Sequence, residues 1–158
     1  MEKVKAIPAG YHSVTPYLIF GKAAAAIEFY KKAFGAKELY RLQGPEGKVG
    51  HAEIQIGDSR LMLADEFPDM DTRGPKSLGG SPVSLMIYLE NVDQAFAQAI
   101  QSGAKEVRPL ENQFYGDRSG TVIDPFGYKW TLATHVEELS MEEIRKRSDE
   151  FLAASVVD

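Results

Sequence analysis

The 158-residue chain contains no cysteine. Disulfide bonds, thiolate metal sites and cysteine nucleophiles are therefore excluded. The sequence also has no apolar run of 18 residues or more, so we expect no membrane-spanning helix and no membrane partner. The first ten residues lack the apolar stretch of a signal peptide, which favours a cytoplasmic location.

Basic residues are in the minority, because 18 Lys and Arg stand against 23 Asp and Glu and give a net charge of −5. Binding to duplexes depends on clustered Lys and Arg, so nucleic acid is not an expected partner. The hydrophobic share of 44% is typical of a globular protein. The length indicates one domain, or two small modules that share a core.

An internal repeat organises the chain. The sequence Gly-Ala-Lys-Glu occurs at residues 35–38 and again at 103–106, an offset of 68 (103 − 35). Each copy follows an alanine-rich segment with apolar residues three or four positions apart, which predicts helices over residues 23–34 and 92–100. The glycine that opens each copy ends the preceding helix.

Strand-like segments accompany each predicted helix in the same order, one before it and three after it. They are rich in β-branched or aromatic residues, and Gly, Pro and Asp separate several of them. The segments are residues 14–20, 38–42, 51–56, 60–64, 83–89, 106–110, 119–123 and 128–134. Each half is therefore a βαβββ module. We predict an α+β fold in which two tandem modules form a curved eight-stranded mixed sheet around a concave cup, followed by a C-terminal helix.

Five consecutive segments make up this single domain. They are an N-terminal tail (1–10), the first module (11–66), a linker or lid loop (67–82), the second module (83–136) and a C-terminal helix and tail (137–158). Ser140 and Glu143 match the capping box S-x-x-E, in which each side chain satisfies a free amide of the first helical turn. This box predicts where the C-terminal helix begins.

Five short stretches carry a resemblance to a known superfamily. They are Ala-Ile-Glu-Phe-Tyr at 26–30, Gly-His-Ala-Glu at 50–53, Leu-Met-Leu-Ala-Asp-Glu at 61–66, Tyr-Gly-Asp-Arg-Ser-Gly at 115–120 and Asp-Pro-Phe-Gly-Tyr-Lys-Trp at 124–130. The chain resembles the vicinal oxygen chelate superfamily, which includes glyoxalase I, fosfomycin-resistance enzymes, extradiol dioxygenases and bleomycin-binding proteins. Within it, the chain is most similar to the PhnB-like, glyoxalase/bleomycin-resistance group. The resemblance covers nearly the whole chain and implies the tandem-module fold and a homodimer, whereas the functions of the superfamily are diverse.

The resemblance also implies four metal-ligand positions, on the first and last strand of each module. In this chain they are Thr15, Met62, Ser84 and Thr131. Three hydroxyls and a thioether lack the imidazole and carboxylate donors that divalent transition metals favour. We therefore expect no metal at these positions and no cofactor. The alternative is a divalent metal at a non-standard site.

His51 and Glu53 are the candidate catalytic pair. They lie two residues apart on a predicted strand, so both side chains project from one face into the cup. Such a pair is a general acid–base couple, half of a metal site or an ordinary hydrogen-bonded pair. Candidate ligand-binding residues, from strand alternation and from the loop that begins at residue 115, are Tyr17, Arg60, Tyr88, Tyr115, Arg118 and Thr131.

Arg118 has two interpretations, as a clamp for a ligand anion or as a partner in a surface ion pair. The aromatic, Met and Arg lining of the cup suits a flat organic molecule with an anionic or oxygenated edge. We therefore expect a small-molecule-binding protein of the PhnB-like type that binds an organic ligand without the usual divalent metal. The alternative is a glyoxalase-like isomerase or lyase that uses His51 and Glu53 for acid–base chemistry, or a relocated metal. A third interpretation is a scaffold with a filled cup that acts through its C-terminal helix.

Overall fold

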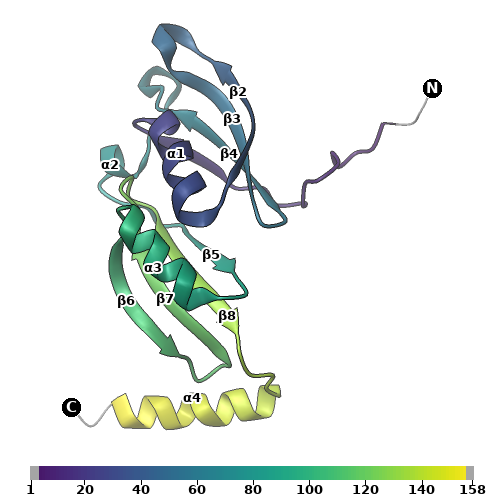
Figure 1. The fold of residues 1–158 in the computed structure, drawn as a ribbon, viewed down its shortest axis with the longest axis vertical. Helices are drawn as coiled ribbons and strands as arrows, with labels where there is room; N and C mark the ends of the chain where they lie inside the picture. The colour runs from purple at the N-terminus through teal and green to yellow at the C-terminus, as the bar shows by residue number, and fades with distance from the viewer. Residues whose placement is uncertain (1–3, 156–158) are drawn as a thin grey trace.

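The computed structural model describes residues 4–155, in which two βαβββ modules follow one another along the chain (Figure 1). The first module consists of β1 (Tyr17–Phe20), α1 (Ala23–Phe34), β2 (Lys37–Gln43), β3 (Val49–Ile56) and β4 (Ser59–Asp65). The second consists of β5 (Ser84–Tyr88), α3 (Val92–Ser102), β6 (Lys105–Asn112), β7 (Asp117–Ile123) and β8 (Lys129–His135). The predicted fold is confirmed in its order of elements, and the strand and helix bounds of the modules agree to within three residues.

The eight strands form two four-stranded mixed sheets, each with its own hydrogen-bonded ladder. Their orders are β1-β4-β3-β2 and β5-β8-β7-β6, and β1 and β5 run parallel to their neighbours β4 and β8. The registers correspond, because Tyr17 lies opposite Met62 and Met86 lies opposite Thr131. The two sheets are not closed onto each other, and within the described chain β1 and β5 are both edge strands.

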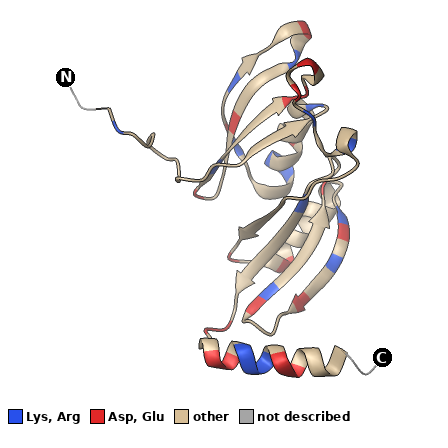
Figure 2. Ribbon diagram, turned by 180° about the vertical axis from the view of Figure 1, so that it is seen from behind, with Lys and Arg blue, Asp and Glu red and all other residues tan. Residues whose placement is uncertain are grey.

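The core lies between the sheets and the helices. In Figure 1, α1 and α3 lie on the same side of their sheets, and the two helices contact each other in the middle of the molecule. Fully buried aromatic side chains fill this region, among them Phe20, Tyr30 and Trp130. The helices thus cover one face of each sheet and leave the other face open (Figure 2).

The segment that joins the modules is more ordered than a plain loop. It contains a 3₁₀ turn at Pro68–Met70 and a short helix, α2 (Pro75–Leu78). The Gly74 amide, directly before α2, donates a hydrogen bond of 2.6 Å to the carboxylate of Glu66. A glycine is needed there because a Cβ would lie 2.6 Å from the carbonyl oxygen of Ile19.

The C-terminal helix α4 (Met141–Ser155) lies across the far end of the second module (Figure 1), with residues of both charge signs along it (Figure 2). Ser140 caps it, because its hydroxyl accepts a bond of 3.2 Å from the Glu143 amide. Only this half of the predicted capping box forms, since the Glu143 carboxylate instead accepts a bond from Arg147. Among the described helices, none is long and apolar enough to cross a membrane.

Candidate functional site

The open face of the first sheet carries a continuous chain of four hydrogen-bonded side chains. The Tyr17 hydroxyl lies 2.9 Å from His51 Nδ1, and His51 Nε2 lies 3.2 Å from Glu53 Oε1. The Tyr40 hydroxyl donates a bond of 2.5 Å to the same carboxylate oxygen. Three strands contribute, β1, β2 and β3, and alternation along β3 directs His51 and Glu53 to the same side.

One end of this hydrogen-bonded series is buried and the other is exposed to solvent. Glu53 is only 4% exposed, whereas Tyr17 is 48% exposed. A buried carboxylate needs hydrogen-bond donors, which Tyr40 supplies directly and His51 supplies in its Nε2-protonated form. Partial burial, with a smaller contribution from Tyr40, raises the pKa of Tyr17. Tyr17 therefore remains a neutral hydroxyl that either donates to His51 or accepts from it.

Two neighbouring cavities adjoin this face. The sheet cavity, about 580 Å³, lies between the open face and the N-terminal segment, and residues such as Tyr11, Tyr40, Glu53 and Met62 line it. The junction cavity, about 500 Å³, lies between the modules, and its lining includes Phe34, Leu61, Leu85, Tyr88 and Trp130. Arg60 and His12 line both cavities.

A second polar cluster lies on the second sheet. The buried carboxylate of Asp117 accepts a bond of 2.9 Å from the Tyr88 hydroxyl and lies 2.8 Å from His135 Nδ1. His135 Nε2 lies 3.2 Å from Glu138. These bonds, the one to Asp117 first, raise the pKa of His135. The pKa of Tyr88 is raised mainly by its bond to Asp117, with a small contribution from Tyr115.

The structure divides the predicted site residues among three places. Tyr17, His51 and Glu53 lie together on the first sheet, and Arg60 lines the sheet cavity together with Glu53. Thr131 lies in the second sheet, where its hydroxyl bonds that of Thr121 at 3.0 Å. Tyr88 belongs to the Asp117 cluster on that same sheet, and Tyr115 lies near Tyr88 in the turn between β6 and β7.

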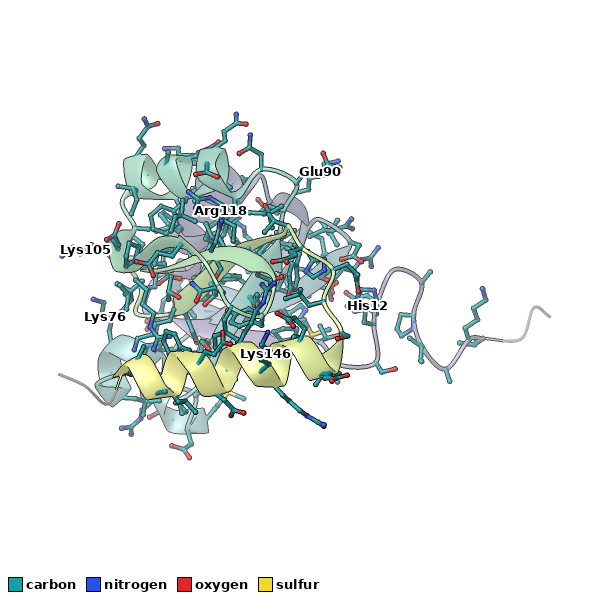
Figure 3. All side chains as sticks on the ribbon, turned by 90° about the horizontal axis from the view of Figure 1, so that it is seen from below. His12, Lys76, Glu90, Lys105, Arg118 and Lys146 are labelled. Carbon is teal, nitrogen blue, oxygen red and sulfur yellow. The ribbon has the colours of Figure 1, made fainter. Side chains whose placement is uncertain are left out.

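Arg118 points to the opposite, helix-covered side of the second sheet. Its guanidinium forms bonds of 2.9 and 2.7 Å with the carboxylate of Asp93 on α3. Figure 3 shows Arg118 beneath α3, away from His12 and the N-terminal segment. The physical reason is the strand boundary. Because β7 begins at Asp117, residue 118 already belongs to the strand and alternates toward α3 rather than lying in a loop.

Sequence reasoning missed three members of these clusters, Tyr40, Asp117 and His135. His135 shares the face of Thr131 by alternation, which a longer final strand would have indicated. Tyr40 is harder to find, because a register shift separates it from Glu38 in the β2–β3 ladder. Such a bulge reverses the alternation that places a side chain on one face.

The four positions that the superfamily uses for its metal carry unsuitable donors here. The Thr15 hydroxyl forms a bond of 3.4 Å to the His12 carbonyl, and the Thr131 hydroxyl bonds Thr121. Met62 offers only a thioether, and Ser84 lies exposed at the start of β5. Hydroxyls and a thioether do not fit a divalent transition metal. Within residues 4–155, no three His, Cys, Asp or Glu side chains are arranged so that they could hold a metal ion together.

Comparison with known families decides the identity of the fold. The sequence model described as the Glyoxalase/Bleomycin resistance protein/Dioxygenase superfamily matches residues 11–132. The chain belongs to this superfamily. The predicted superfamily resemblance is thereby confirmed.

Named relatives of this superfamily member are largely without an assigned function. An uncharacterized protein of Mycobacterium tuberculosis, Rv0887c, is 44% identical over 136 residues, which cover 84% of this chain and 80% of the relative. The solved structure of an Arabidopsis thaliana gene product, At5g48480, is 27% identical with a TM-score of 0.63 and covers 78% of this chain and 98% of that one. The solved structure of a PhnB protein of Bacillus cereus, titled a putative 3-demethylubiquinone-9 3-methyltransferase, has a TM-score of 0.60 at 24% identity. The match covers 78% of this chain and 99% of that one. The last likeness concerns the fold alone.

Proposed function

We propose that this superfamily member is a small-molecule-binding protein of the PhnB-like type, which holds an organic ligand in the sheet cavity. The observation that carries the proposal is the hydrogen-bonded series Tyr17–His51–Glu53–Tyr40, whose members Glu53 and Tyr40 line a cavity of about 580 Å³. Ligand sites in proteins have this size, and they combine apolar or aromatic walls with a few placed polar groups. The aromatic rings supply contact area, and the hydroxyls orient the ligand.

Binding is tested with N-phenyl-1-naphthylamine, a neutral aromatic probe whose fluorescence rises in apolar surroundings. We expect saturable 1:1 binding to the wild-type protein. Tyr40→Ala should weaken binding about tenfold because it removes a cavity wall and a donor to Glu53. Tyr115→Ala is the matched control, since Tyr115 is comparably exposed, 37% against 44%, but lies in the turn between β6 and β7 of the second module. Equal affinities for wild type and Tyr40→Ala would contradict a site in the sheet cavity.

The proposed function includes binding without a metal at the four superfamily positions. The support for it is the donor set, because hydroxyls and a thioether hold divalent cations weakly. Elemental analysis of protein purified without chelators should find no stoichiometric Zn, Ni, Mn or Fe. A tightly held transition metal at one equivalent would overturn this part of the proposal and favour a relocated site.

We also propose a homodimer. Its support is the open face of each sheet, where large apolar side chains remain exposed, including Leu42 and Met86. Faces and edge strands of this kind are normally covered by another surface. Sedimentation at micromolar concentration should give twice the chain mass of 17.5 kDa; a monomer would refute this assembly. A cytoplasmic location stays a prediction, which fractionation of the cells that make the protein would test.

A second candidate function is that of a glyoxalase-like isomerase or lyase. The observation that favours it is the contact of His51 with both Tyr17 and Glu53, since a histidine oriented by a carboxylate is suited to proton transfer. This candidate predicts turnover of a hemithioacetal, such as that of methylglyoxal and glutathione, by the wild-type protein. It also predicts loss of that turnover in His51→Ala with an unchanged melting temperature. Binding without turnover would leave the first proposal in place.

A further inference from the structure

We infer that Arg60 makes the site selective for organic anions, so that the ligand is an apolar or aromatic molecule with a carboxylate, sulfonate or phosphate group. This inference rests on the proposed binding function and adds the chemical class of the ligand. It follows from the environment of Arg60, which lines both the sheet cavity and the junction cavity.

Arg60 carries a charge that the fold does not neutralise. Three other arginines form ion pairs, Arg41 with Glu38, Arg118 with Asp93 and Arg147 with Glu137. For Arg60, no Asp or Glu among residues 4–155 forms such a pair. It is also partly buried, and its Nε is enclosed without any hydrogen-bond acceptor. A shielded guanidinium without a counterion is an unusual arrangement, because its charge is costly to remove from water.

The N-terminal segment holds this guanidinium in place without satisfying it. The Tyr11 ring stacks on Arg60, with its centroid 4.7 Å from the guanidinium carbon. Such stacking covers a face of the guanidinium plane, whereas all five N–H groups point outward within the plane. Gly10 passes close to the same group, since a Cβ there would lie 2.5 Å from Nη2. The plane is thus fixed, and the two terminal nitrogens, unlike the enclosed Nε, remain available to a two-oxygen acceptor.

The acidic groups of the two cavities are already engaged or exposed. Glu53 in the sheet cavity is bonded to Tyr40 and His51. Asp58 in the junction cavity lies in an exposed turn and accepts a bond of 2.9 Å from the Ser59 hydroxyl. An incoming anion therefore meets the unpaired cation of Arg60 beside aromatic surface. Arginine binds planar oxyanions through two parallel N–H···O bonds, which lysine cannot do.

A competing explanation is that Arg60 only anchors the N-terminal segment through Tyr11. Loss of Arg60 would then change the shape of the cavity and affect charged and neutral ligands alike. A pair of probes with the same aromatic body separates the two explanations. We use 8-anilinonaphthalene-1-sulfonate and its neutral counterpart N-phenyl-1-naphthylamine, which differ by the sulfonate.

Fluorescence titration of the full chain measures both dissociation constants. We expect the wild-type protein to bind the sulfonate at least about tenfold more tightly than the neutral probe, as a charge-assisted pair allows. Arg60→Met should abolish this preference and leave the affinity for the neutral probe within about twofold, because Met retains the apolar stem. Arg60→Lys should keep part of the preference. Arg108→Met is the control, since Arg108 is an exposed arginine on β6.

Three outcomes separate this inference from the proposed function. Loss of the sulfonate preference in Arg60→Met, but not in Arg108→Met, supports both. Unchanged preference in a folded Arg60→Met, with the neutral probe still bound, overturns anion selectivity and leaves the binding function intact. Absence of saturable binding of either probe to the wild-type protein overturns the binding function itself. If Arg60→Met does not fold, Arg60→Lys takes its place. A sulfonate preference that is reduced in Arg60→Lys but as strong as wild type in Arg108→Met then supports the inference. An unreduced sulfonate preference in Arg60→Lys refutes it.

Discussion

At the scale of single residues, each module buries a carboxylate between a tyrosine and a histidine. Glu53 contacts Tyr40 and His51, and Asp117 contacts Tyr88 and His135. A buried carboxylate is costly unless donors surround it, so each acid depends on its neighbours. The two clusters lie at different positions along their strands. Glu53 lies opposite Met62 within the β3–β4 ladder, whereas Asp117 lies opposite His135 at the end of the β7–β8 ladder. The repeat therefore duplicates the backbone but not the polar clusters.

His135 gives a prediction about pH. Its pKa is raised above the unfolded value, which is about 6.5, by Asp117 and Glu138. The stabilisation from charged His135 is complete below that value and is lost as pH rises through the folded pKa. The unfolding free energy should therefore fall over this pH range, and His135→Gln should flatten the dependence. NMR titration of the His135 ring reports the folded pKa directly. A pKa at or below 6.5 would contradict the prediction.

Gly10 gives a prediction about the N-terminal segment. Its φ of +83° disfavours any L-residue, and a Cβ would collide with the guanidinium of Arg60. Gly10→Ala should therefore separate Tyr11 from Arg60, which NMR detects as loss of the ring-current shift on the Arg60 side-chain protons. Gly47→Ala is the control, because Gly47 also has a positive φ of +75° but no atom lies within 4 Å of its Cβ position. Equal effects of the two variants on Arg60 would contradict this account.

How much of the site the sequence predicts depends on strand register. Simple alternation correctly brings His51 and Glu53 to one face, because β3 is regular over those residues. It fails for Tyr40, since the shift between Glu38 and Tyr40 reverses the side of the sheet that later residues face. Bulges and strand ends depend on cross-strand hydrogen bonds, which a single sequence does not contain.

At the scale of elements, the last strand of each module caps the module's own helix. The Asp65 carboxylate at the end of β4 accepts a bond of 2.6 Å from the Ala23 amide at the start of α1. The Thr134 hydroxyl in β8 accepts one of 3.0 Å from the Val92 amide at the start of α3. The corresponding residues of the two pairs are 69 positions apart, 65 and 134 for the acceptors and 23 and 92 for the donors. A helix begins with free amides that need acceptors, so the repeat includes this device.

The two capping side chains differ in the number of backbone amides that they accept bonds from. Asp65 also accepts a bond of 2.6 Å from the Val49 amide, so Asp65→Ala leaves two buried amides without an acceptor. We expect a loss of about 3 kcal/mol of unfolding free energy from Asp65→Ala. Thr134→Val removes the acceptor of one amide, that of Val92, and the donor to the Leu89 carbonyl oxygen, and it should cost only about 1 kcal/mol because a single amide loses its acceptor. Urea denaturation of both variants measures the difference. Equal losses would show that the Val49 bond adds nothing.

The elements themselves are largely predictable because local signals agree with the fold. Glycines in left-handed conformation end α1 and α3 at Gly35 and Gly103, where the repeat places them. The short helix α2 was not predicted, since its start depends on the contact of Gly74 with Glu66 rather than on local pattern. The sequence alone also does not reveal that the eight strands divide into two ladders, because their separation depends on how the modules pack.

At the scale of the whole molecule, polar contacts join the two modules. The buried carboxylate of Asp124, in the turn before β8, accepts bonds from Tyr30 of α1 at 2.6 Å and from Trp130 at 2.9 Å. The Tyr128 hydroxyl bonds the backbone of Ile19 in β1, accepting at 3.1 Å and donating at 3.0 Å. These bonds cross from one module to the other through the aromatic core. We infer that the modules unfold together rather than separately.

This coupling gives the last prediction. Tyr30→Phe removes one of the donors to a buried carboxylate and should lower the unfolding free energy by about 1.5–3 kcal/mol, as bonds to charged groups do. Asp124→Asn should cost a similar amount, and the double variant should cost clearly less than the sum, because both changes break the same bond. The unfolding transition should remain single when followed by the fluorescence of Trp130 and by far-UV circular dichroism. Additive losses would contradict a direct bond between the modules. Two separate transitions in wild type would show instead that each module is stable alone.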